Sequence, residues 1–212
     1  MKRYCLYLFI LIGISCSAEL KAQKNGTVYK GNDPAVRYTG RTLVSPDGSV
    51  AFDWVGTYLE TRFTGGKLSV KVSETGTSYY NVFVDGKLHK VVKVCGTDTL
   101  IHLVSGIDKR IHSLKIQKRS EGEFGKTTVH QFVLSGSGRL AEEPAVRTRH
   151  IEFIGNSLTC GYGTDGKHRD EPFLVETENC NLTFASMVAR YYDADYTLIA
   201  HSGRGCLLYT SP

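Results

Sequence analysis

The sequence has no feature of a membrane-spanning or nucleic-acid-binding protein. Its N-terminal apolar run, residues 6–14, is well short of the roughly 20 residues that a membrane-spanning helix needs. No run of basic residues would attract a nucleic acid. No Cys/His spacing resembles a zinc site, and no low-complexity tract interrupts the chain. We therefore expect a globular protein with no membrane span and no nucleic-acid partner.

Residues 1–22 are predicted to be a secretory signal peptide. Two basic residues precede the apolar run of residues 6–14, and small residues with cleavage points after Ala18 or Ala22 follow it. Cys16 leaves a lipoprotein anchor open, although the residues before it fit a lipoprotein signal poorly. We therefore expect a secreted or periplasmic protein.

The composition is that of a globular protein with a mild positive charge. Hydrophobic residues make up 41% of the chain and charged residues 22%. Loss of residues 1–22 would remove three positive charges and one negative charge, so the net charge would fall from +5 to +3. Such a small excess favours a neutral substrate. The 22 glycines favour a turn-rich β architecture over a helical bundle.

Four cysteines follow the predicted signal peptide: Cys95, Cys160, Cys180 and Cys206. An exported protein can form disulfides. Cys160 and Cys180 flank one loop, and a bridge between them would hold that loop in place. Spacing alone does not establish pairing, so two buried thiols are the alternative.

Residues 50–134 alternate between apolar and polar side chains. Residues 68–72 show this period of two, which is typical of a strand with one buried face. The pair Asp85-Gly86 between two such segments predicts a tight hairpin turn. Strands are predicted at residues 68–72, 81–84, 88–94, 99–104, 111–118 and 129–134. Turns lie between these strands, and the segment shows no helical periodicity. We therefore expect a jelly-roll β-sandwich over residues 23–138.

Some aromatic and histidine residues of this half are candidates for sugar binding or ligation. Four aromatic residues could stack on a sugar ring, but packing between the sheets is the favoured role because aromatic side chains dominate cores. These are Trp54, Tyr58, Tyr79 and Tyr80. Single histidines on the strands are expected to face solvent: His89, His102, His112 and His130.

The pattern changes after the sandwich. Residues 139–149 are predicted to be a linker, and residues 150–212 to belong to a second unit. A short buried strand at residues 151–154 and another strand at residues 196–200 flank a helix at residues 182–192. Such a β-α-β unit builds a parallel sheet with a right-handed crossover.

The helix of residues 182–192 carries one broad apolar face. Asn181 is available as its N-terminal cap. Apolar residues recur at the helical period, at Phe184, Val188, Tyr191 and Tyr192. This pattern is typical of a helix that packs against a core through one face.

Ser157 follows the first strand of this unit and is a candidate nucleophile. In open parallel sheets, ligands bind beyond the carboxyl ends of the strands, so a serine at this point is accessible to a substrate. Gly155 lets the chain turn sharply, and the amide of Ser157 is free to donate to an oxyanion. The alternative is an ordinary polar turn, since glycine, asparagine and serine are common turn residues.

The second strand ends in a glycine-bearing loop at the same edge of the sheet. This loop comprises residues 201–205, and the amide of Gly205 is a candidate second oxyanion donor. Two such loops at one sheet edge favour acyl-transfer chemistry. His168 and His201 are not assigned as a general base, because loop histidines are more often structural or solvent-facing.

Residues 151–163 resemble the first conserved block of the SGNH (GDSL-type) hydrolases. Gly155-Asn156-Ser157-Leu158 stands where that family usually has Gly-Asp-Ser, so Asn156 is a departure that leaves the nucleophile intact. Residues 196–205 resemble the second block, in which a glycine that matches Gly205 contributes an oxyanion amide. With the tract of residues 176–180 and the preceding sandwich, the chain resembles carbohydrate esterase family two, in which a jelly-roll domain precedes an SGNH domain.

The resemblance implies a serine esterase that removes acetyl groups from xylan and related polysaccharides or oligosaccharides, without a metal or an organic cofactor. Ser157 would be the nucleophile, and the amides of Ser157 and Gly205 would hold the oxyanion. The family's oxyanion asparagine and its catalytic Asp/His block are not found before Pro212. The resemblance therefore indicates a truncated α/β domain, and we expect this chain to be inactive because its serine lacks a base.

Two other functions stay open. The sandwich could bind glycans without catalysis, or a serine esterase could act on a lipid or peptidoglycan ester instead of a polysaccharide. Hydrolysis of p-nitrophenyl acetate that is lost in Ser157→Ala separates catalysis from binding. Panels of acyl chains and glycans separate the ester substrates.

Overall fold

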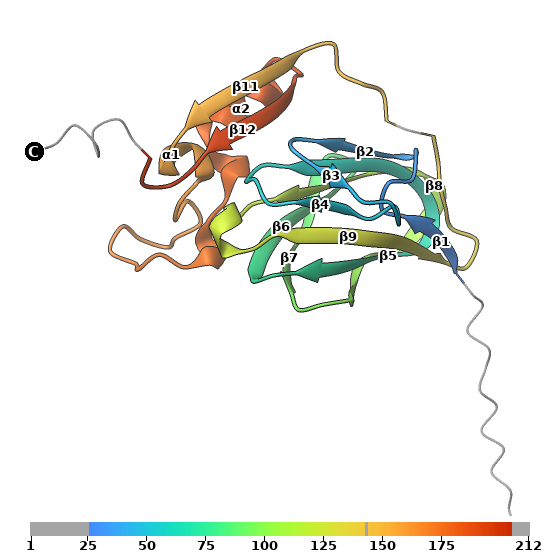
Figure 1. The fold of residues 1–212 in the computed structure, drawn as a ribbon. Helices are drawn as coiled ribbons and strands as arrows, with labels where there is room; N and C mark the ends of the chain where they lie inside the picture. The colour runs from blue at the N-terminus through green and yellow to red at the C-terminus, as the bar shows by residue number, and fades with distance from the viewer. Residues whose placement is uncertain (1–25, 143, 205–212) are drawn as a thin grey trace, which may run out of the picture.

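A computed structural model describes residues 26–142 and 144–204. The predicted signal peptide, Gly205 and Cys206 lie outside these residues. Figure 1 shows a large β unit followed by a smaller unit that contains the helices of the C-terminal half. Within the described residues, no helix has the length and apolar character needed to cross a membrane.

The N-terminal unit is one sheet of ten strands, in which all neighbours run antiparallel. Two long strands, β5 (Tyr58–Glu74) and β8 (Thr99–Lys118), pair with each other at its centre. The others are β1 (Thr27–Lys30), β2 (Val36–Thr39), β3 (Leu43–Val44), β4 (Val50–Phe52), β6 (Thr77–Val84), β7 (Lys87–Cys95), β9 (Thr127–Ser135) and β10 (Arg139–Leu140). A short 3-10 helix, η1 (Gly122–Phe124), precedes β9. The predicted antiparallel β architecture of this half is confirmed; β10 pairs with β5, although it falls in the predicted linker.

The predicted hairpin is confirmed, but one pair of predicted strands is wrong. Asp85 and Gly86 have φ values of 50° and 75°, the left-handed turn that joins β6 to β7. Residues 99–104 and 111–118 were expected to be separate strands and are both part of β8. Between them lies Gly106 with a left-handed φ of 72°, and Ile107 pairs with Gly66 of β5 between two register shifts, so the strand continues through an irregularity.

The apolar side of the alternation forms the core of this unit. Leu68, Val70 and Val72 on β5 are all buried, and they pack in one cluster with Phe63 and Phe132. The four aromatic residues singled out above divide into two buried ones, Tyr58 and Tyr80, and two partly exposed ones, Trp54 and Tyr79.

His112 contradicts the expectation that the strand histidines face solvent. Its side chain is 3% exposed. Nδ1 lies 2.7 Å from Asp85 Oδ2, and Nε2 lies 2.9 Å from Asp108 Oδ1. The hydrogen bond with Asp85, reinforced by Asp108, raises the pKa of His112. The residue therefore ties the β6–β7 turn to β8.

The second unit has the predicted parallel arrangement. β11 (His150–Gly155) and β12 (Asp195–Ala200) form a two-stranded parallel sheet, with residue pairs from His150–Asp195 to Gly155–Ala200 (Figure 1). Between them lie α1 (Ser157–Cys160), η2 (Val175–Thr177), η3 (Cys180–Leu182) and α2 (Phe184–Tyr191). The β-α-β prediction is confirmed.

The packing of α2 differs from the prediction. Its large apolar residues Phe184, Val188, Tyr191 and Tyr192 are 37–83% exposed. The small residues Ala185, Ser186 and Ala189 are buried instead, because small side chains let the helix approach its neighbours closely.

Two further local predictions are wrong. Asn181 does not cap α2, since it lies within η3 and Thr183 is the residue that precedes the helix. Residues 151–154 were expected to be buried, yet Ile154 is 81% exposed.

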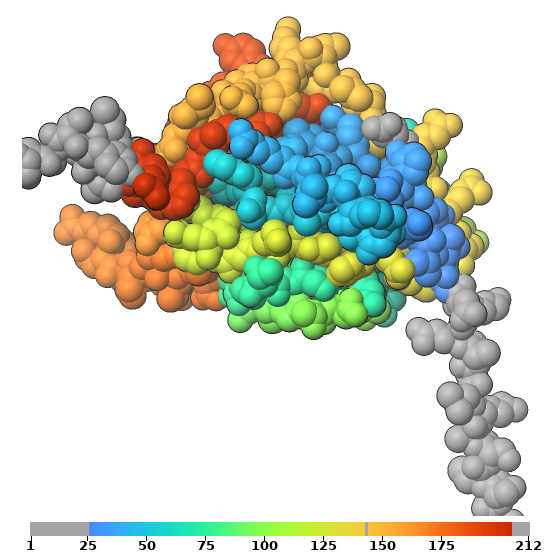
Figure 2. Space-filling model, in the orientation of Figure 1, coloured from blue at the N-terminus to red at the C-terminus, as the bar shows by residue number. Residues whose placement is uncertain are grey.

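The two units share a core, and Figure 2 shows the second unit lying directly against the first. Val55 and Tyr58 of the first unit pack in one cluster with residues of the second, including Cys180 and Leu198. Gly56 is required at this contact: its φ is 76°, and a Cβ there would lie 2.6 Å from Leu198 Cδ1. The interface is therefore closely packed.

Asp195, at the start of β12, adds a polar anchor between the units. Its carboxylate accepts hydrogen bonds from Tyr58 Oη at 2.7 Å, Arg37 Nη1 at 2.6 Å and Arg147 Nη1 at 2.7 Å. Burial opposes its ionisation, but these donors outweigh burial and hold the pKa of Asp195 well below its ordinary value.

Candidate active site

Ser157 is the first residue of α1, directly beyond the end of β11. Asn156 caps this short helix, since its Oδ1 accepts a hydrogen bond from Leu158 N at 3.1 Å. Gly155 leaves room for the turn: a Cβ at this position would lie 2.0 Å from Thr159 Oγ1. The sequence thus places a serine at a tight strand-to-helix turn, and asparagine serves there as the cap.

The ends of β11 and β12 lie side by side, as expected. Gly155 pairs with Ala200, and His201 N donates to Gly155 O at 3.3 Å. The loop after β12 therefore starts next to the loop that carries Ser157. Gly205, the predicted second oxyanion donor, lies outside the described residues.

The hydroxyl of Ser157 is half-buried and has no hydrogen-bond partner within the part of the chain that the structure describes. His201, the nearest histidine along the neighbouring loop, is engaged elsewhere. Its Nδ1 lies 2.7 Å from Ser202 O and 3.8 Å from Glu121 Oε2, and its Nε2 lies 4.0 Å from Glu123 Oε2. The geometry gives Ser157 no general base among these residues.

Glu121, on the loop between β8 and η1, holds the loop after β12. Its carboxylate accepts hydrogen bonds from both the backbone N–H and the hydroxyl of Ser202, the former at 2.7 Å. The first unit therefore positions a loop of the second. Sequence reasoning missed this residue, because a single glutamate 81 positions before its partner gives no local signal.

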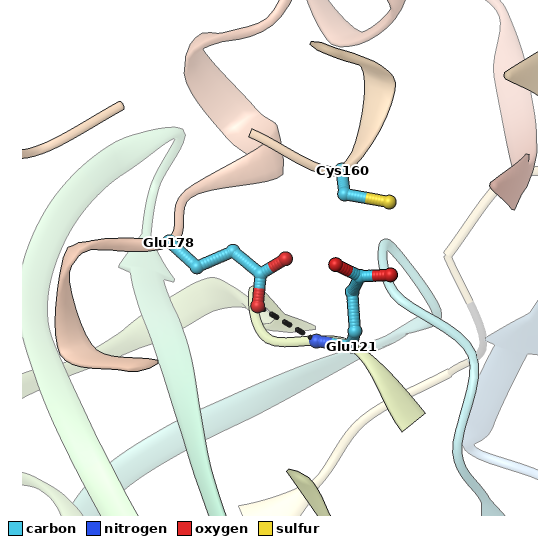
Figure 3. A group of neighbouring side chains, drawn as sticks. All are labelled: Glu121, Cys160 and Glu178. Carbon is cyan, nitrogen blue, oxygen red and sulfur yellow. Dashed lines mark hydrogen bonds between the residues drawn. The ribbon is translucent and has the colours of Figure 1, made fainter. Parts of the chain in front are cut away.

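Glu121 belongs to a buried cluster with Cys160 and Glu178, shown in Figure 3. Glu178 Oε2 accepts a hydrogen bond from Glu121 N at 2.9 Å, whereas Glu178 Oε1 is buried without a partner among the described residues. Burial, aided by the charge of Glu121, raises the pKa of Glu178 to about 9. Burial, with Glu121 again contributing, also raises the pKa of the Cys160 thiol. At neutral pH the raised pKa values keep both Glu178 and the Cys160 thiol protonated beside Glu121.

Among the described residues, these three could together hold a metal ion, because one ligand atom of each lies within 4.8 Å of the others. Both oxygens of Glu121 are already hydrogen-bonded to Ser202. The raised pKa values of Glu178 and Cys160 also favour protons over a metal. The cluster is better suited to positioning a loop than to holding an ion.

The predicted disulfide between Cys160 and Cys180 is wrong, because both residues are free and buried. Their sulfur atoms have different surroundings: Cys160 contacts the two glutamates, and Cys180 Sγ donates to Lys118 O at 3.4 Å. The alternative of two buried thiols is confirmed.

Arg119 on the first unit holds the polar stretch that follows α1. Its Nε donates to Glu178 O at 2.6 Å and its Nη2 to Glu176 O at 3.0 Å. The same Nη2 pairs with Asp165. With 3% of its side chain exposed, this guanidinium takes over the structural role that the disulfide was expected to have.

A pocket of about 220 Å³ lies between the first unit and the end of β12. Trp54, Glu121, Glu123 and His201 are among its lining residues. The guanidinium of Arg41 lies 5.3 Å from the Trp54 ring centroid. The partly exposed indole leaves open the sugar-stacking role that was considered for it.

The Carbohydrate esterase 2 N-terminal family model matches residues 38–144. Among curated proteins, the Cellulase/esterase CelE of Acetivibrio thermocellus is 33% identical over 174 residues, 82% of this chain and 21% of that protein. An Acetylxylan esterase / glucomannan deacetylase of Cellvibrio japonicus is 27% identical over 177 residues, 83% of this chain and 49% of that protein.

Solved structures of family two carbohydrate esterases also match this chain. A family two carbohydrate esterase from Clostridium thermocellum in complex with cellohexaose matches with a TM-score of 0.76 and 34% identity, over 80% of this chain and 52% of that one. A family two carbohydrate esterase from Cellvibrio japonicus matches with a TM-score of 0.75 and 26% identity, over 84% of this chain and 53% of that one. This chain thus spans about half the length of those structures and a smaller share of CelE.

Proposed function

Since the chain belongs to carbohydrate esterase family 2, we propose that it forms the serine-bearing part of an exported esterase that removes O-acetyl groups from xylan-like polysaccharides. The activities named for its relatives support a polysaccharide ester as the substrate class. In this proposal residues 23–138 are a jelly-roll domain, residues 139–149 a linker and residues 150–212 the first part of an SGNH hydrolase domain.

The observation that carries the proposal is the position of Ser157. It starts α1 at the carboxyl end of a parallel strand, beside the loop that follows β12. The N–H of Ser157, as the first helical residue, precedes the first intrahelical hydrogen bond and is free to bind an oxyanion. Ser157 Oγ would attack the acetyl carbonyl, and the N–H groups of Ser157 and Gly205 would stabilise the tetrahedral intermediate.

A histidine must accept the proton of Ser157, and we place it on a segment that packs against the second unit. Large apolar side chains on β11, α1 and α2 are exposed to solvent: Ile154, Leu158 and Tyr191 are 81%, 77% and 83% exposed. Surfaces of this kind mark a site where another segment packs. Relatives of about twice this length have the additional chain that such a segment requires.

The test is acetate release from acetylated xylan and from p-nitrophenyl acetate. We compare the 212-residue chain with the same chain extended by any residues that its gene encodes after Pro212. The extended protein should hydrolyse both esters and lose this activity in Ser157→Ala, whereas the 212-residue chain should show only background hydrolysis. Hydrolysis by the 212-residue chain that requires both Ser157 and His201 would instead make His201 the base.

The pocket beside Trp54 supports a second candidate, a glycan-binding protein without catalysis. Trp54 is the only tryptophan of the chain, so its fluorescence reports directly on this pocket. Cellohexaose and xylohexaose should alter the emission if a sugar ring stacks on the indole. Binding together with no ester hydrolysis by any extended form would favour this second function.

A further inference from the structure

A second pocket, of about 320 Å³, lies where the first unit, the predicted linker (residues 139–149) and α2 meet. It shares no residue with the pocket beside His201. β8 contributes Lys115, the linker contributes Pro144 and Arg147, and α2 contributes Arg190. Small-molecule sites occur preferentially at such junctions between units.

Positive charge predominates in this second pocket. Its lining residues include one acidic residue, Glu60, and three basic residues, Lys115, Arg147 and Arg190. Arg147 is neutralised by ion pairs with Glu60 at 3.3 Å and Asp195 at 2.7 Å. Among the described residues, neither Lys115 nor Arg190 has a carboxylate within ion-pair distance. These two cations thus have no direct ion-pair partner among the described residues, and the charges of Glu60 and Asp195 act on Lys115 only from beyond that distance.

The surroundings of these two cations leave donors available. The Nζ of Lys115 lies 3.7 Å from the centroid of the Tyr58 ring and 5.2 Å from that of the Tyr196 ring, and it has no hydrogen-bond acceptor among the described residues. Arg190 Nη1 donates to Asn181 O at 2.9 Å and to Asn181 Oδ1 at 2.8 Å. The remaining N–H groups of the guanidinium have no partner within the described part of the chain and can bind a ligand.

We propose that this pocket binds a small organic carboxylate between the ammonium of Lys115 and the guanidinium of Arg190. Charge-assisted hydrogen bonds of this kind are the strong ones, and a guanidinium fork matches a carboxylate. Glu60 on the same wall disfavours a dianion such as phosphate. Phe83, Leu114 and Pro144 supply apolar surface for a carbon skeleton.

Burial supports the same conclusion. Burial lowers the pKa of Lys115 to about 8. The charge of Arg147 also lowers this pKa, whereas the charges of Glu60 and Asp195 raise it. A bound anion would restore the charged form of this amine, so the ligand and the proton stabilise each other.

The size of the second pocket limits the ligand. Its volume lies at the lower end of the roughly 300–1,000 Å³ of small-molecule sites, so we expect nothing larger than one sugar residue. Two sources fit this chemistry: acetate, the product of the esterase proposed above, and the uronate groups of polysaccharides. Binding does not require Ser157, so this proposal can fail or hold independently of the esterase.

The experiment is an NMR titration of the purified protein with acetate, glucuronate, glucose and phosphate, at low salt and pH 7. We expect saturable shifts around the pocket with acetate or glucuronate, with a dissociation constant on the order of 1 mM, and whichever binds identifies the source. Glucose should not bind, and phosphate should bind more weakly. Lys115→Met and Arg190→Gln should each weaken carboxylate binding at least tenfold, whereas Lys93→Met, an exposed lysine on β7, should leave it unchanged.

A second readout does not depend on variants. An amine reagent at pH 8 should label Lys115 in the folded protein, and a bound carboxylate should slow this labelling. The proposal is overturned if neither carboxylate shifts the pocket resonances of the folded protein. Equal binding of glucose, tighter binding of phosphate, or unchanged affinity in the folded Arg190→Gln variant would also overturn it.

Discussion

Glu178 makes the stability of the protein depend on pH, and Glu178→Gln should remove that dependence. Its carboxyl is fully buried, and this burial raises its pKa from 4.5 to about 9. In the unfolded chain the same carboxyl ionises near its ordinary value. Between the two pKa values, the folded protein holds a proton that the unfolded chain has released. The contribution of Glu178 to stability should therefore be greatest in acid and fall as the pH rises through this range.

One proton of difference corresponds to about 1.4 kcal/mol per pH unit. Between about pH 6.0 and pH 7.5, the free energy of unfolding of the wild type should fall by about 2 kcal/mol relative to that of Glu178→Gln. The amide of glutamine cannot ionise, and its oxygen can still accept the hydrogen bond from Glu121 N. His112 and Lys115 titrate in both proteins, so their contributions cancel in the comparison.

The assay is urea-induced unfolding at 25 °C, followed by circular dichroism at several pH values within this window. Glu176→Gln is the matched control, because this glutamate is exposed and lies only two positions away; it should behave like the wild type. Equal pH slopes for the wild type and Glu178→Gln would refute the reasoning, since they would mean that Glu178 holds no extra proton in the folded state.

Three further predictions follow from the contact between the units. Asp195→Asn should lower the free energy of unfolding by about 1.5–3 kcal/mol, because it weakens the charged hydrogen bonds from Arg37 and Arg147 while Glu60 still pairs with both; a loss below about 1 kcal/mol in urea unfolding would contradict this. A thiol reagent should modify Cys95 in the native protein, and Cys160 and Cys180 only after unfolding without reductant; two thiols that stay unreactive in denaturant would reveal a bridge. Residues 24–138 alone should give a β-rich circular dichroism spectrum and a cooperative melt, at a lower temperature than the whole chain; a non-cooperative, helix-rich protein would count against this domain boundary.

The β half was predictable because its signals are local. The alternation through residues 68–72 places every second side chain in the core, and Asp85-Gly86 is one of the few pairs that tolerate a left-handed turn at both positions. The location of Ser157 was predictable for the same reason, since strand, glycine, cap and serine follow one another directly. The single strand β8 was missed because a bulged strand and two strands with a turn have similar local patterns.

The contacts between the units could not be predicted in this way. The helix pattern identified the large apolar residues of α2, but the face that packs consists of Ala185, Ser186 and Ala189, whose small size gives almost no periodic signal. Glu121 and Arg119 act on segments roughly 40 to 80 positions away in the chain. Their partners depend on how two units dock, which no short sequence window contains.

Ser157 is proposed above as the nucleophile of a polysaccharide acetyl esterase. The most direct test is the rate of acetate release from acetylated xylan by the protein together with any residues that its gene encodes after Pro212. Ser157→Ala should reduce this rate to background while the melting temperature stays near that of the wild type, and Ser137→Ala, an exposed serine on the first unit, should leave the rate unchanged. Acetate release by a folded Ser157→Ala variant at the wild-type rate would contradict the account.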